Sequence, residues 1–385
     1  MKLSKIFKEF FENEKASGLI LIFCTISSIL LTNSIFQDKY TAIWHIQLAG
    51  QSIEYWINDG LMTIFFLLIG LELKREIYKG ELSNIKNALL PIFGALGGMV
   101  VPALIYTLFN WGLPTQSGAG IPMATDIAFA LGVLSLLGNR VPISLKIFLT
   151  ALAVIDDLGA ILVIAVFYTT SLEITHLLVA AGILGFLFFL NRLRVYNLIL
   201  YLVGGILMWY FMLHSGVHAT ITGVLLALAI PFKEGKKSAP SSILEHFLHK
   251  PVSFFILPLF VLANTAIVIS PNWIESITHT NGIGIIAGLV LGKPLGITTF
   301  CLAAVLLGFC ALPSDLKWKH ILGAGFLGGI GFTMSIFITI LAFDDAEIIT
   351  QSKLAILAAS LIAGTIGYTM LKLILETKDS IKNHP

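Results

Sequence analysis

Residues 144–168 read SLKIFLTALAVIDDLGAILVIAVFY, an apolar run long enough to cross a membrane, with two adjacent acids, Asp156 and Asp157, at its centre. A carboxylate at the middle of a bilayer costs about 2.5–3.5 kcal/mol on insertion scales. Consecutive residues of a helix point about 100° apart, so one neighbour cannot satisfy both acids. The acid pair therefore indicates cation or proton handling, and the alternative is a structural knot of buried hydrogen bonds.

The composition is that of a membrane protein with many spans. Of 385 residues, 57% are hydrophobic and 12% are charged, and the mean hydropathy is +0.91. A soluble protein carries about twice that share of charge. The net charge of +2 gives no basis for binding nucleic acid, and Cys24, Cys301 and Cys310 form no C-x-x-C pair, so neither a disulfide framework nor a zinc site is expected. The N-terminal stretch 1–18 is amphipathic and charged, as in a retained surface helix rather than a signal peptide.

Apolar runs of about 15–25 residues, the length that spans a bilayer, recur twelve times. They lie near residues 15–34, 54–73, 88–110, 118–137, 144–168, 175–191, 195–213, 217–231, 245–269, 282–306, 320–343 and 350–375. The sequence therefore predicts an all-α integral membrane protein with about twelve transmembrane helices, forming a single domain over residues 1–385.

Basic residues decide the topology. The segments that follow even-numbered spans hold Lys74, Arg75, Lys79, Lys86, Arg140, Lys146, Arg192, Arg194, Lys233, Lys236, Lys237, Lys250, Lys317 and Lys319. The segments after odd-numbered spans hold almost none, with Lys39 and Lys353 as exceptions. This alternation is the positive-inside pattern, so both termini are expected in the cytoplasm.

One outer segment differs from the other connections. Residues 43–55 alternate apolar and polar side chains on both sides of Gly50, and Trp44 and Trp56 stand at its ends. This pattern is typical of a β-hairpin, which could pair with a second copy of the chain. An ordinary hydrated loop is the alternative, and the sequence does not decide between them.

Once the charges assigned to loops are set aside, six charged residues remain within the predicted spans: Asp59, Glu72, Asp126, Asp156, Asp157 and Lys293. Asp59 and Glu72 lie near opposite ends of the second span, so contact with water and a functional role are both open. The other four lie deep in the membrane, where ionisable residues mark transport sites by default.

Two spans carry helix-breaking residues. Span 4 holds Gly118, Gly120 and Pro122 just before Thr125 and Asp126, and proline removes a backbone donor. Span 11 is interrupted by several glycines: Gly323, Gly325, Gly328, Gly329 and Gly331. Interrupted spans placed alike in two halves are typical of a transporter built from inverted repeats. Close helix packing through glycine explains span 11 nearly as well, but not the proline and acid of span 4.

Lys293 stands alone in the segment LGKPLGI, residues 291–297. The spacing from Gly288 is one residue short of a phosphate loop, and Pro294 replaces its Ser or Thr, so that motif is rejected. A buried lysine needs a counter-charge, and an aspartate of the pair is the obvious one. Asp126 and Lys293 could also compensate the dipole ends that broken helices expose at mid-membrane.

The histidines form two groups, His214 with His218, and His246 and His249 beside Glu245. Interfacial polar residues are the simplest interpretation, and a report on internal pH is the alternative. No HExxH metal motif, DDxxD motif or nucleophile–base constellation occurs, so we expect neither a bound cofactor nor an enzyme.

Several of these segments together resemble the NhaA-type bacterial sodium/proton antiporters. They are ALAVIDDLGAI (151–161), IPMATDIAFALGVL (121–134), LGKPLGI (291–297), SGVHATITG (215–223), WINDGLM (56–62) and FFLLIGLELKREI (65–77). The resemblance covers nearly the whole chain, and the motifs fall in the family's order.

The resemblance implies a homodimeric transporter in the bacterial inner membrane, with spans 4 and 11 crossing at mid-membrane. It implies electrogenic, pH-regulated exchange of cytoplasmic Na⁺ or Li⁺ for external protons. By the same resemblance Asp156 and Asp157 would bind the cation and protons, Lys293 would pair with Asp156, and Thr125 and Asp126 would lie at the helix crossing. The residues Glu72, His218, Glu245, His246 and His249 would serve pH regulation, and the hairpin would be a dimer contact.

Residue chemistry points to the same mechanism. Na⁺ is a hard cation that prefers oxygen ligands, as Ca²⁺ does, and protonation of an aspartate removes the charge that holds it. The adjacent acids are expected to titrate as a coupled unit. A passive cation channel is the main alternative, whereas an organic-solute carrier would need more polar residues at mid-membrane.

Overall fold

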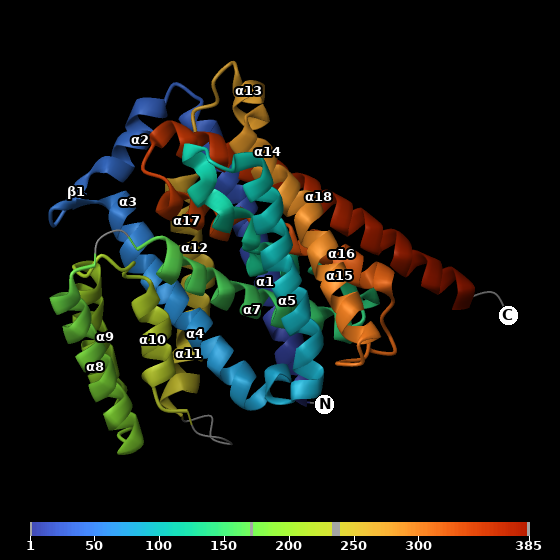
Figure 1. Ribbon diagram of the computed structural model, residues 1–385, viewed down its shortest axis with the longest axis horizontal. Coiled ribbons are helices and arrows are strands. Elements are labelled where there is room, and N and C mark those ends of the chain that lie inside the picture. Colours follow the sequence, from blue (N-terminus) through green and yellow to red (C-terminus); the bar gives the residue numbers. More distant parts are fainter. Residues whose placement is uncertain (1, 170–171, 233–238, 383–385) are drawn as a thin grey trace. The chain divides into compact units, whose positions relative to one another are not determined.

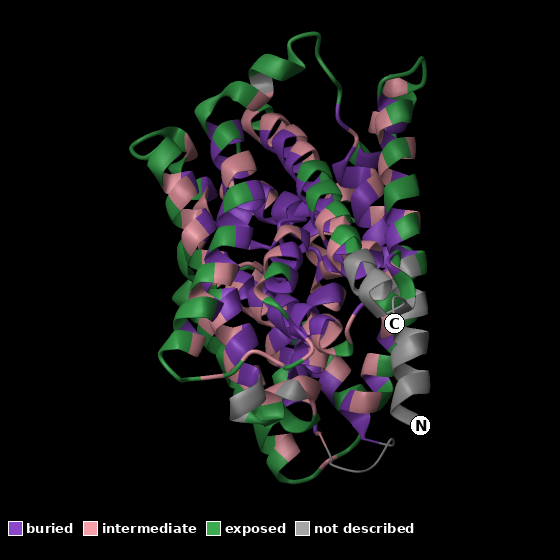
Figure 2. Ribbon diagram, turned by 90° about the vertical axis from the view of Figure 1, so that its right-hand side faces the viewer, coloured by how far each residue is buried: buried purple, intermediate pink, exposed green. Residues whose placement is uncertain are grey.

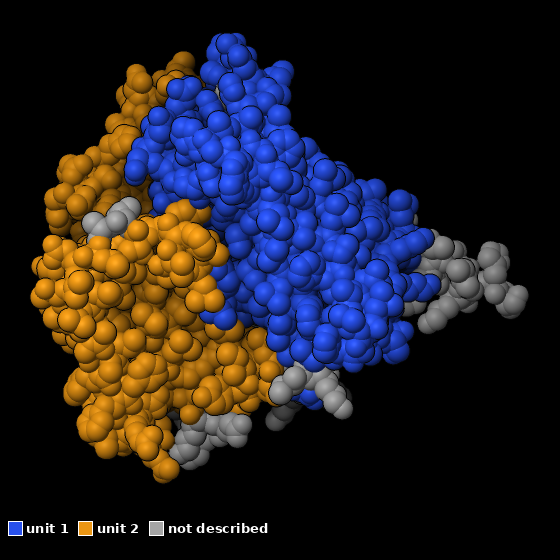
Figure 3. Space-filling model, viewed as in Figure 1, with its two compact units in different colours: residues 1–29, 84–160, 267–385 blue, residues 30–83, 161–266 orange. Residues whose placement is uncertain are grey.

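The computed structural model describes residues 2–169, 172–232 and 239–382, and it is nearly all helical (Figure 1). The chain divides into two compact units (Figure 3). Unit 1 comprises residues 1–29, 84–160 and 267–385, and unit 2 comprises residues 30–83 and 161–266. Each unit is therefore assembled from segments that lie far apart in the sequence.

Unit 1 contains the acid pair and both predicted interrupted spans. Its elements are α1 (Lys2–Thr32, continuing into unit 2), α5 (Ile85–Asn110), η3 (Pro114–Met123), α6 (Ile127–Ser135), η4 (Gly138–Arg140), α7 (Ile143–Phe167, ending in unit 2), α13 (Trp273–Thr278), α14 (Thr280–Ala287), η6 (Gly288–Gly292), α15 (Lys293–Leu306), α16 (Trp318–Gly328), α17 (Phe332–Ala342) and α18 (Ala346–Lys382).

Unit 2 contains a small sheet and the remaining helices. Its elements are α2 (Gln37–His45), β1 (Gln47–Leu48), β2 (Gln51–Ser52), α3 (Ile53–Tyr55), η1 (Trp56–Leu61), α4 (Met62–Lys79), η2 (Glu81–Ser83), α8 (Ile174–Arg192), α9 (Leu198–Leu213), α10 (Ile221–Ala229), α11 (Pro240–Pro251), η5 (Val252–Ile256) and α12 (Leu257–Asn264). The segments η1 and η5, like η6 of unit 1, are π-helical turns that continue directly into α-helices.

The helices confirm a membrane protein with several spans. Within the described residues, seven helices are long and apolar enough to cross a membrane, or up to ten if three bent pairs each form one span. Every predicted run contains a helix, but α9 has only 16 residues and α10 only 9. The count of twelve spans and their arrangement as inverted repeats therefore remain predictions.

Two bent pairs are the interrupted spans that the sequence predicts. The axes of η3 and α6 differ by 41° across residues 124–126, and those of α16 and α17 by 48° across residues 329–331. The first break follows Pro122 and has extended backbone at Ala124 and Asp126. Its first arm, η3, is a 3₁₀ helix of ten residues, which is unusually long for that geometry.

Segment 43–55 contains a sheet of two strands with two residues each, and the longer hairpin that the sequence predicts is not confirmed. β1 and β2 pair antiparallel with Leu48 opposite Gln51, and the turn residues Ala49 and Gly50 have φ of 51° and 86°. Two positive φ values are those of the tight turn that suits the twist of a hairpin. The flanking parts of segment 43–55 are helical instead, because α2 extends to His45 and α3 begins at Ile53.

Some basic residues that were expected in loops lie in helices. α4 continues to Lys79, so Lys74 and Arg75 are helical, and Lys74 is buried at 6% exposure. Lys146 likewise lies in α7, and Lys250 in α11. A charged residue ends an apolar run of the sequence, but it need not end the helix, because the backbone hydrogen bonds of the helix can continue past it.

Glycines bring α5 and α15 into backbone contact in unit 1. Gly288, Gly292 and Gly296 recur every four residues, the spacing that lets membrane helices approach closely. A β-carbon at Gly296 would collide with the backbone of Gly97, 2.7 Å from its carbonyl carbon. Burial differs from helix to helix (Figure 2): α17 is buried at every residue from Phe332 to Thr339, whereas α8 buries only Ala180 and Leu187.

We expect Gly296→Ala to lower the melting temperature of the detergent-purified protein by several degrees. The new methyl group meets backbone rather than a movable side chain, and overpacking of this kind costs about 1–3 kcal/mol. Gly185→Ala on α8 is the matched control, because nothing lies within 4 Å of a β-carbon there. Equal melting temperatures for the two variants would contradict the close contact of α5 and α15.

Candidate functional site

Asp156 and Asp157 lie at the middle of α7, which runs unbroken from Ile143 to Phe167. Their exposures are 0% and 1%, and the neighbouring Leu152 is also fully buried. A buried charge is costly unless it is paired and hydrogen-bonded. The partners of the two carboxylates therefore decide what this part of α7 can do.

Asp156 is the acceptor of a compact polar cluster in unit 1. The Lys293 ammonium forms an ion pair with Asp156 Oδ2, and its Nζ also donates to Thr125 Oγ1 at 2.9 Å. Thr125 Oγ1 in turn lies 2.8 Å from Asp156 Oδ2 and 2.8 Å from the carbonyl oxygen of Gly328. Asp156 Oδ1, in contrast, accepts no hydrogen bond from any residue that the structure describes. The protein thus satisfies one oxygen of this carboxylate.

Lys293 reaches the cluster because of the local form of its helix. It begins α15 directly after the π-helical turn η6, and its side chain is completely buried. Such π turns inside helices are frequent at functional sites. The Lys293 side chain lies on the side of this helix that faces α5, where a β-carbon at Gly98 would be 3.6 Å from Lys293 Cδ, so its ammonium group ends inside the protein.

Asp126 joins the two interrupted spans. Its Oδ1 accepts the backbone N–H of Phe129 at 3.0 Å, which caps the start of α6. Its Oδ2 accepts the backbone N–H of Thr333 at 3.1 Å, at the start of α17, and also the Thr333 hydroxyl. The backbone N–H of Asp126 donates to Ile330 at 2.7 Å. A single negative charge therefore stabilises the positive ends of two half-helices.

The structure places all five predicted cation-site residues in unit 1. Thr125, Asp156 and Lys293 contact one another directly, Asp126 follows Thr125, and Asp157 follows Asp156 on α7. Two of these partners, Thr333 for Asp126 and the Gly328 carbonyl for Thr125, were not predicted from the sequence. The glycines of span 11 predicted that its helix breaks near residue 328, but not which atoms at the break would bond to Thr125 and Asp126.

The residues suggested for pH regulation lie in unit 2. Arg75 Nη1 forms an ion pair with Glu245, and Arg75 Nη2 pairs with Glu76 Oε1 at 3.0 Å. The two carboxyl side chains are 12% and 14% exposed, whereas the Arg75 side chain is 40% exposed, so the acids are shielded and the arginine is partly open to the surface. The arginine connects α4 to α11, a role that its assignment to a loop had hidden.

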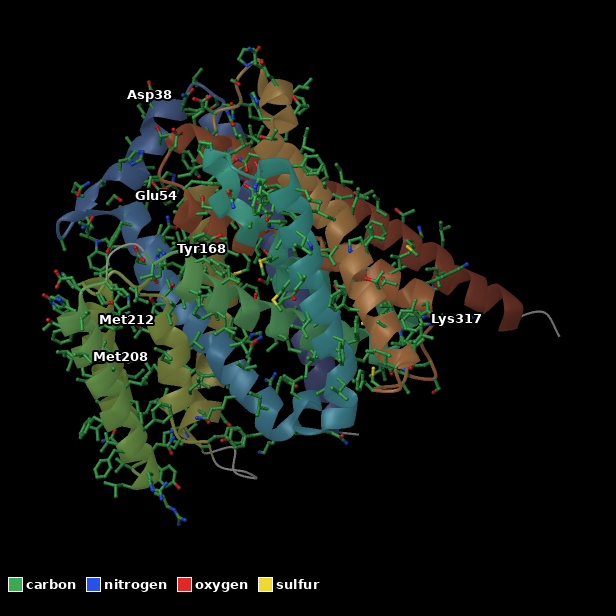
Figure 4. The ribbon with its side chains drawn as sticks, viewed as in Figure 1. Asp38, Glu54, Tyr168, Met208, Met212 and Lys317 are labelled. Carbon is green, nitrogen blue, oxygen red and sulfur yellow. The ribbon has the colours of Figure 1, made fainter. Side chains whose placement is uncertain are left out.

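The remaining members of that set have separate surroundings. His218 Nε2 lies 2.9 Å from the carbonyl oxygen of Tyr168, a residue labelled in Figure 4. Glu72 is half-buried on α4, His249 is half-buried on α11, and His246 is exposed. The ion pair of Glu245 with Arg75 links two helices of unit 2, α11 and α4.

Within the described residues, no three His, Cys, Asp or Glu side chains lie close enough together to hold a metal ion. A many-helix membrane protein with a buried lysine on one of two adjacent acids, beside two interrupted helices, is an ion transporter. The chain belongs to the family described as Na⁺/H⁺ antiporter 1, which matches residues 8–371.

Relatives agree along nearly the full length. The chain is 67% identical over 376 residues to the Na⁺/H⁺ antiporter NhaA of Flavobacterium psychrophilum, covering 98% of each chain. It is 61% identical over 376 residues to the NhaA antiporter of Cytophaga hutchinsonii, covering 98% of this chain and 97% of that one. A solved sodium proton antiporter from Methanocaldococcus jannaschii is 18% identical with a TM-score of 0.49, over 98% of this chain and 100% of that chain.

The protein is thus a sodium/proton antiporter of many spans, and a passive channel is not favoured. Its relatives are named as transporters rather than enzymes.

We expect Lys293→Ala to lower the melting temperature strongly, because it leaves the buried Asp156 carboxylate without its counter-charge. Breaking a buried ion pair on one side costs about 3–5 kcal/mol. The double variant Lys293→Ala with Asp156→Asn is expected to recover much of the loss, since residue 156 then carries no charge that needs a partner. Lys317→Ala, at an exposed lysine labelled in Figure 4, is the control. Unchanged melting of the single variant in detergent would argue against the pair.

Asp126→Ala is expected to destabilise more than loss of a single exposed cap. Removing a helix cap costs about 0.5–2 kcal/mol, and Asp126 caps two buried helix ends. Asp345→Ala is the comparison, because Asp345 accepts the N–H groups of Glu347 and Ile348 at the exposed start of α18 only. Equal falls in melting temperature would show that the bond to α17 contributes nothing.

Proposed function

We propose that Asp156 and Asp157 form one site at which Na⁺ and protons compete, and that this competition is the antiport mechanism. The observation that carries the proposal is the buried cluster of Asp156, Lys293 and Thr125, next to the second buried acid on α7. Two adjacent acids in an apolar membrane helix are expensive to keep, and a transported cation gives the reason for keeping them.

The oxygen atoms around Asp156 suit a small hard cation. Carboxylate, hydroxyl and carbonyl oxygens are the ligands that such ions take in proteins, and the carboxylates, Thr125 and the Gly328 carbonyl supply all three kinds. Li⁺ has the same ligand preference, so we include it as a substrate. Protonation of the acids cancels the charge that attracts the ion, and the cation leaves.

Lys293 acts in this scheme as an internal competitor. Its ammonium pairs with Asp156 Oδ2, which is also an oxygen that an entering cation would need. The lysine stabilises the carboxylate when no cation is bound, and it must give up at least part of this contact when Na⁺ binds. Asp126 serves the site indirectly, by holding the two half-helices beside Thr125.

Two carboxylates support electrogenic exchange. If both acids bind protons and together they release one Na⁺, more than one proton moves for each cation. The inward proton gradient and the membrane potential then drive export of cytoplasmic Na⁺. This transport would serve Na⁺ and pH homeostasis in the bacterium.

We place pH regulation in unit 2. The proposed set is Glu72, His218, Glu245, His246 and His249, to which the structure adds Arg75 as the ion-pair partner of Glu245. Histidine is the side chain whose ordinary titration falls nearest to physiological pH, and the carboxylates around Arg75 can respond to the same change.

Membrane placement and assembly complete the proposal. The alternation of basic residues supports an inner-membrane protein with both termini in the cytoplasm and twelve spans in inverted repeats, acting as a single transporter domain. The sheet of β1 and β2 supports a homodimer, because short exposed strands can pair with a second copy.

The deciding experiment measures proton release from inside-out vesicles, by dequenching of a ΔpH dye, on addition of Na⁺, Li⁺ or K⁺ from pH 6.5 to 8.5. We expect a response to Na⁺ and Li⁺ that falls at least about tenfold in Asp157→Asn, equivalent to 1.4 kcal/mol or more of lost transition-state stabilisation. The substituted protein is expected to stay folded, since asparagine keeps the size of the side chain and removes a buried charge.

Asp38→Asn is the matched control, because this acid of α2 is exposed and is labelled in Figure 4. A folded and fully active Asp157→Asn protein would refute the assigned site. Cation currents without any proton exchange, in wild-type protein, would instead return the channel alternative.

A further inference from the structure

The end of α10 is closed by a buried lysine. α10 ends at Ala229, and Ile230 is already extended, so the last carbonyl groups need donors from outside the helix. Pro231 follows and has no N–H to offer to Ala227, four residues earlier. The backbone alone therefore cannot satisfy this helix end.

Lys74 of α4 supplies most of the missing donors. Its Nζ donates to the carbonyl oxygens of Leu228 at 2.7 Å, Ile230 at 2.6 Å and Ala227 at 3.4 Å. The fourth carbonyl, of Ala229, accepts from Asn191 Nδ2 of α8 at 2.8 Å. An ammonium group has three N–H donors, and here all three are used on one helix end.

The charge of Lys74 is compensated by the helix end rather than by an acid. Among the described residues, no carboxylate forms an ion pair with it, and its exposure is 6%. The carbonyl end of a helix carries about half a negative charge, which favours a cation. A lysine near the end of a membrane helix can turn toward water, as the exposed Lys79 does on the same helix. Lys74 instead points to α10.

Two kinds of contact hold α4 against α10, close contacts at glycines and the hydrogen bonds of Lys74. A β-carbon at Gly70 would lie 3.1 Å from Val224 Cα, and one at Gly223 would lie 2.7 Å from Leu67 N. These glycine contacts bring the two backbones close together. Directional bonds from Lys74 set the axial position, because a slide of one turn, about 5.4 Å, would break all three.

α10 connects two parts of unit 2 that the proposed function uses. The N–H of Ile221, the first residue of α10, donates to the carbonyl oxygen of His218 at 3.2 Å. At the other end, Lys74 stands next to Arg75, which pairs with Glu245 of α11. Two consecutive basic residues of α4 thus connect this helix to two different neighbours.

We propose that Lys74 is a positioning residue that fixes the register of α10 on α4, and that turnover of the antiporter depends on this register. The proposal rests on the proposed antiport function, but Lys74 itself binds no transported ion. All three of its hydrogen bonds go to α10 within unit 2, whereas the proposed cation site lies in unit 1.

The test compares Lys74→Met, Asn191→Ala and Lys250→Met in proteoliposomes. Lys74→Met keeps the length of the side chain without its donors, and Lys250→Met removes an exposed charge from α11 as the control. We expect Vmax for Na⁺ to fall at least about fivefold in Lys74→Met, a change of about 1 kcal/mol in the barrier. The apparent KM is expected to stay within about twofold, because uniform binding of Na⁺ is not altered. Asn191→Ala is expected to show a smaller loss of Vmax, since it removes one neutral bond.

Two results would overturn the proposal: a Vmax of folded Lys74→Met equal to that of Lys250→Met, or a raised KM with Vmax kept, which would place Lys74 on the ion path. If Lys74→Met does not fold, Asn191→Ala carries the test and must lose Vmax at constant KM.

Spin labels at Ile77 and Leu228, in protein whose three cysteines are replaced, measure the register without transport. Both positions are partly exposed, at 47% and 36%. We expect one narrow distance in the parent protein and a shifted or broadened one with Lys74→Met. An unchanged distance would overturn the positioning role. Absence of exchange in wild-type protein, with the distance change present, would overturn the proposed function and leave Lys74 as the residue that sets the register.

Discussion

The structure depends on one buried ion pair, between Asp156 of α7 and Lys293 of α15. Each charge alone would be costly to bury, and each compensates the other. Thr125 and the close approach of α5 and α15 hold the two side chains in the positions that this ion pair requires. A buried ion pair is poor evidence for stability, because apolar side chains in its place often cost nothing. Under the proposed function, its presence is explained by the exchange of one positive partner of Asp156, Lys293, for another, Na⁺.

The interrupted helices impose a second constraint on the structure. Their buried ends need polar or charged partners, as the buried acids do. A helix interrupted inside a membrane exposes N–H and carbonyl groups that water cannot reach. Asp126 resolves this for two helix starts at once, and Thr125 donates toward the end of α16 at Gly328. The same short segment, residues 124–126, therefore repairs the break and supplies the site with a hydroxyl group.

The sequence was sufficient where the membrane restricts the choices. Charged residues deep in apolar runs are rare, so Asp156, Asp157 and Lys293 stood out, and the breaks at Pro122 and at the glycines of span 11 fell where helices end.

The sequence was insufficient where a residue's partner lies far along the chain. Nothing in the local pattern links Thr333 to Asp126, or Arg75 to Glu245, because those bonds exist only after the helices pack. Lys74 was assigned to a loop for a related reason. Two consecutive basic residues are typical of a loop, and its burial is explained by the carbonyl groups at the end of α10, which the local sequence does not reveal. The hairpin was overestimated because alternation of apolar and polar residues does not show where the adjacent helices stop.

The hydroxyl of Thr125 has a single proton, but it lies within hydrogen-bond distance of two acceptors, Asp156 Oδ2 and the Gly328 carbonyl oxygen. It can donate to only one of them at a time. If Asp156 becomes protonated or its charge is neutralised by a bound ion, its pull on that proton weakens, and the carbonyl at the end of α16 becomes the better acceptor. A change of charge on α7 is thereby converted into a change of hydrogen bonding at the interrupted helix, through the rotation of one C–O bond.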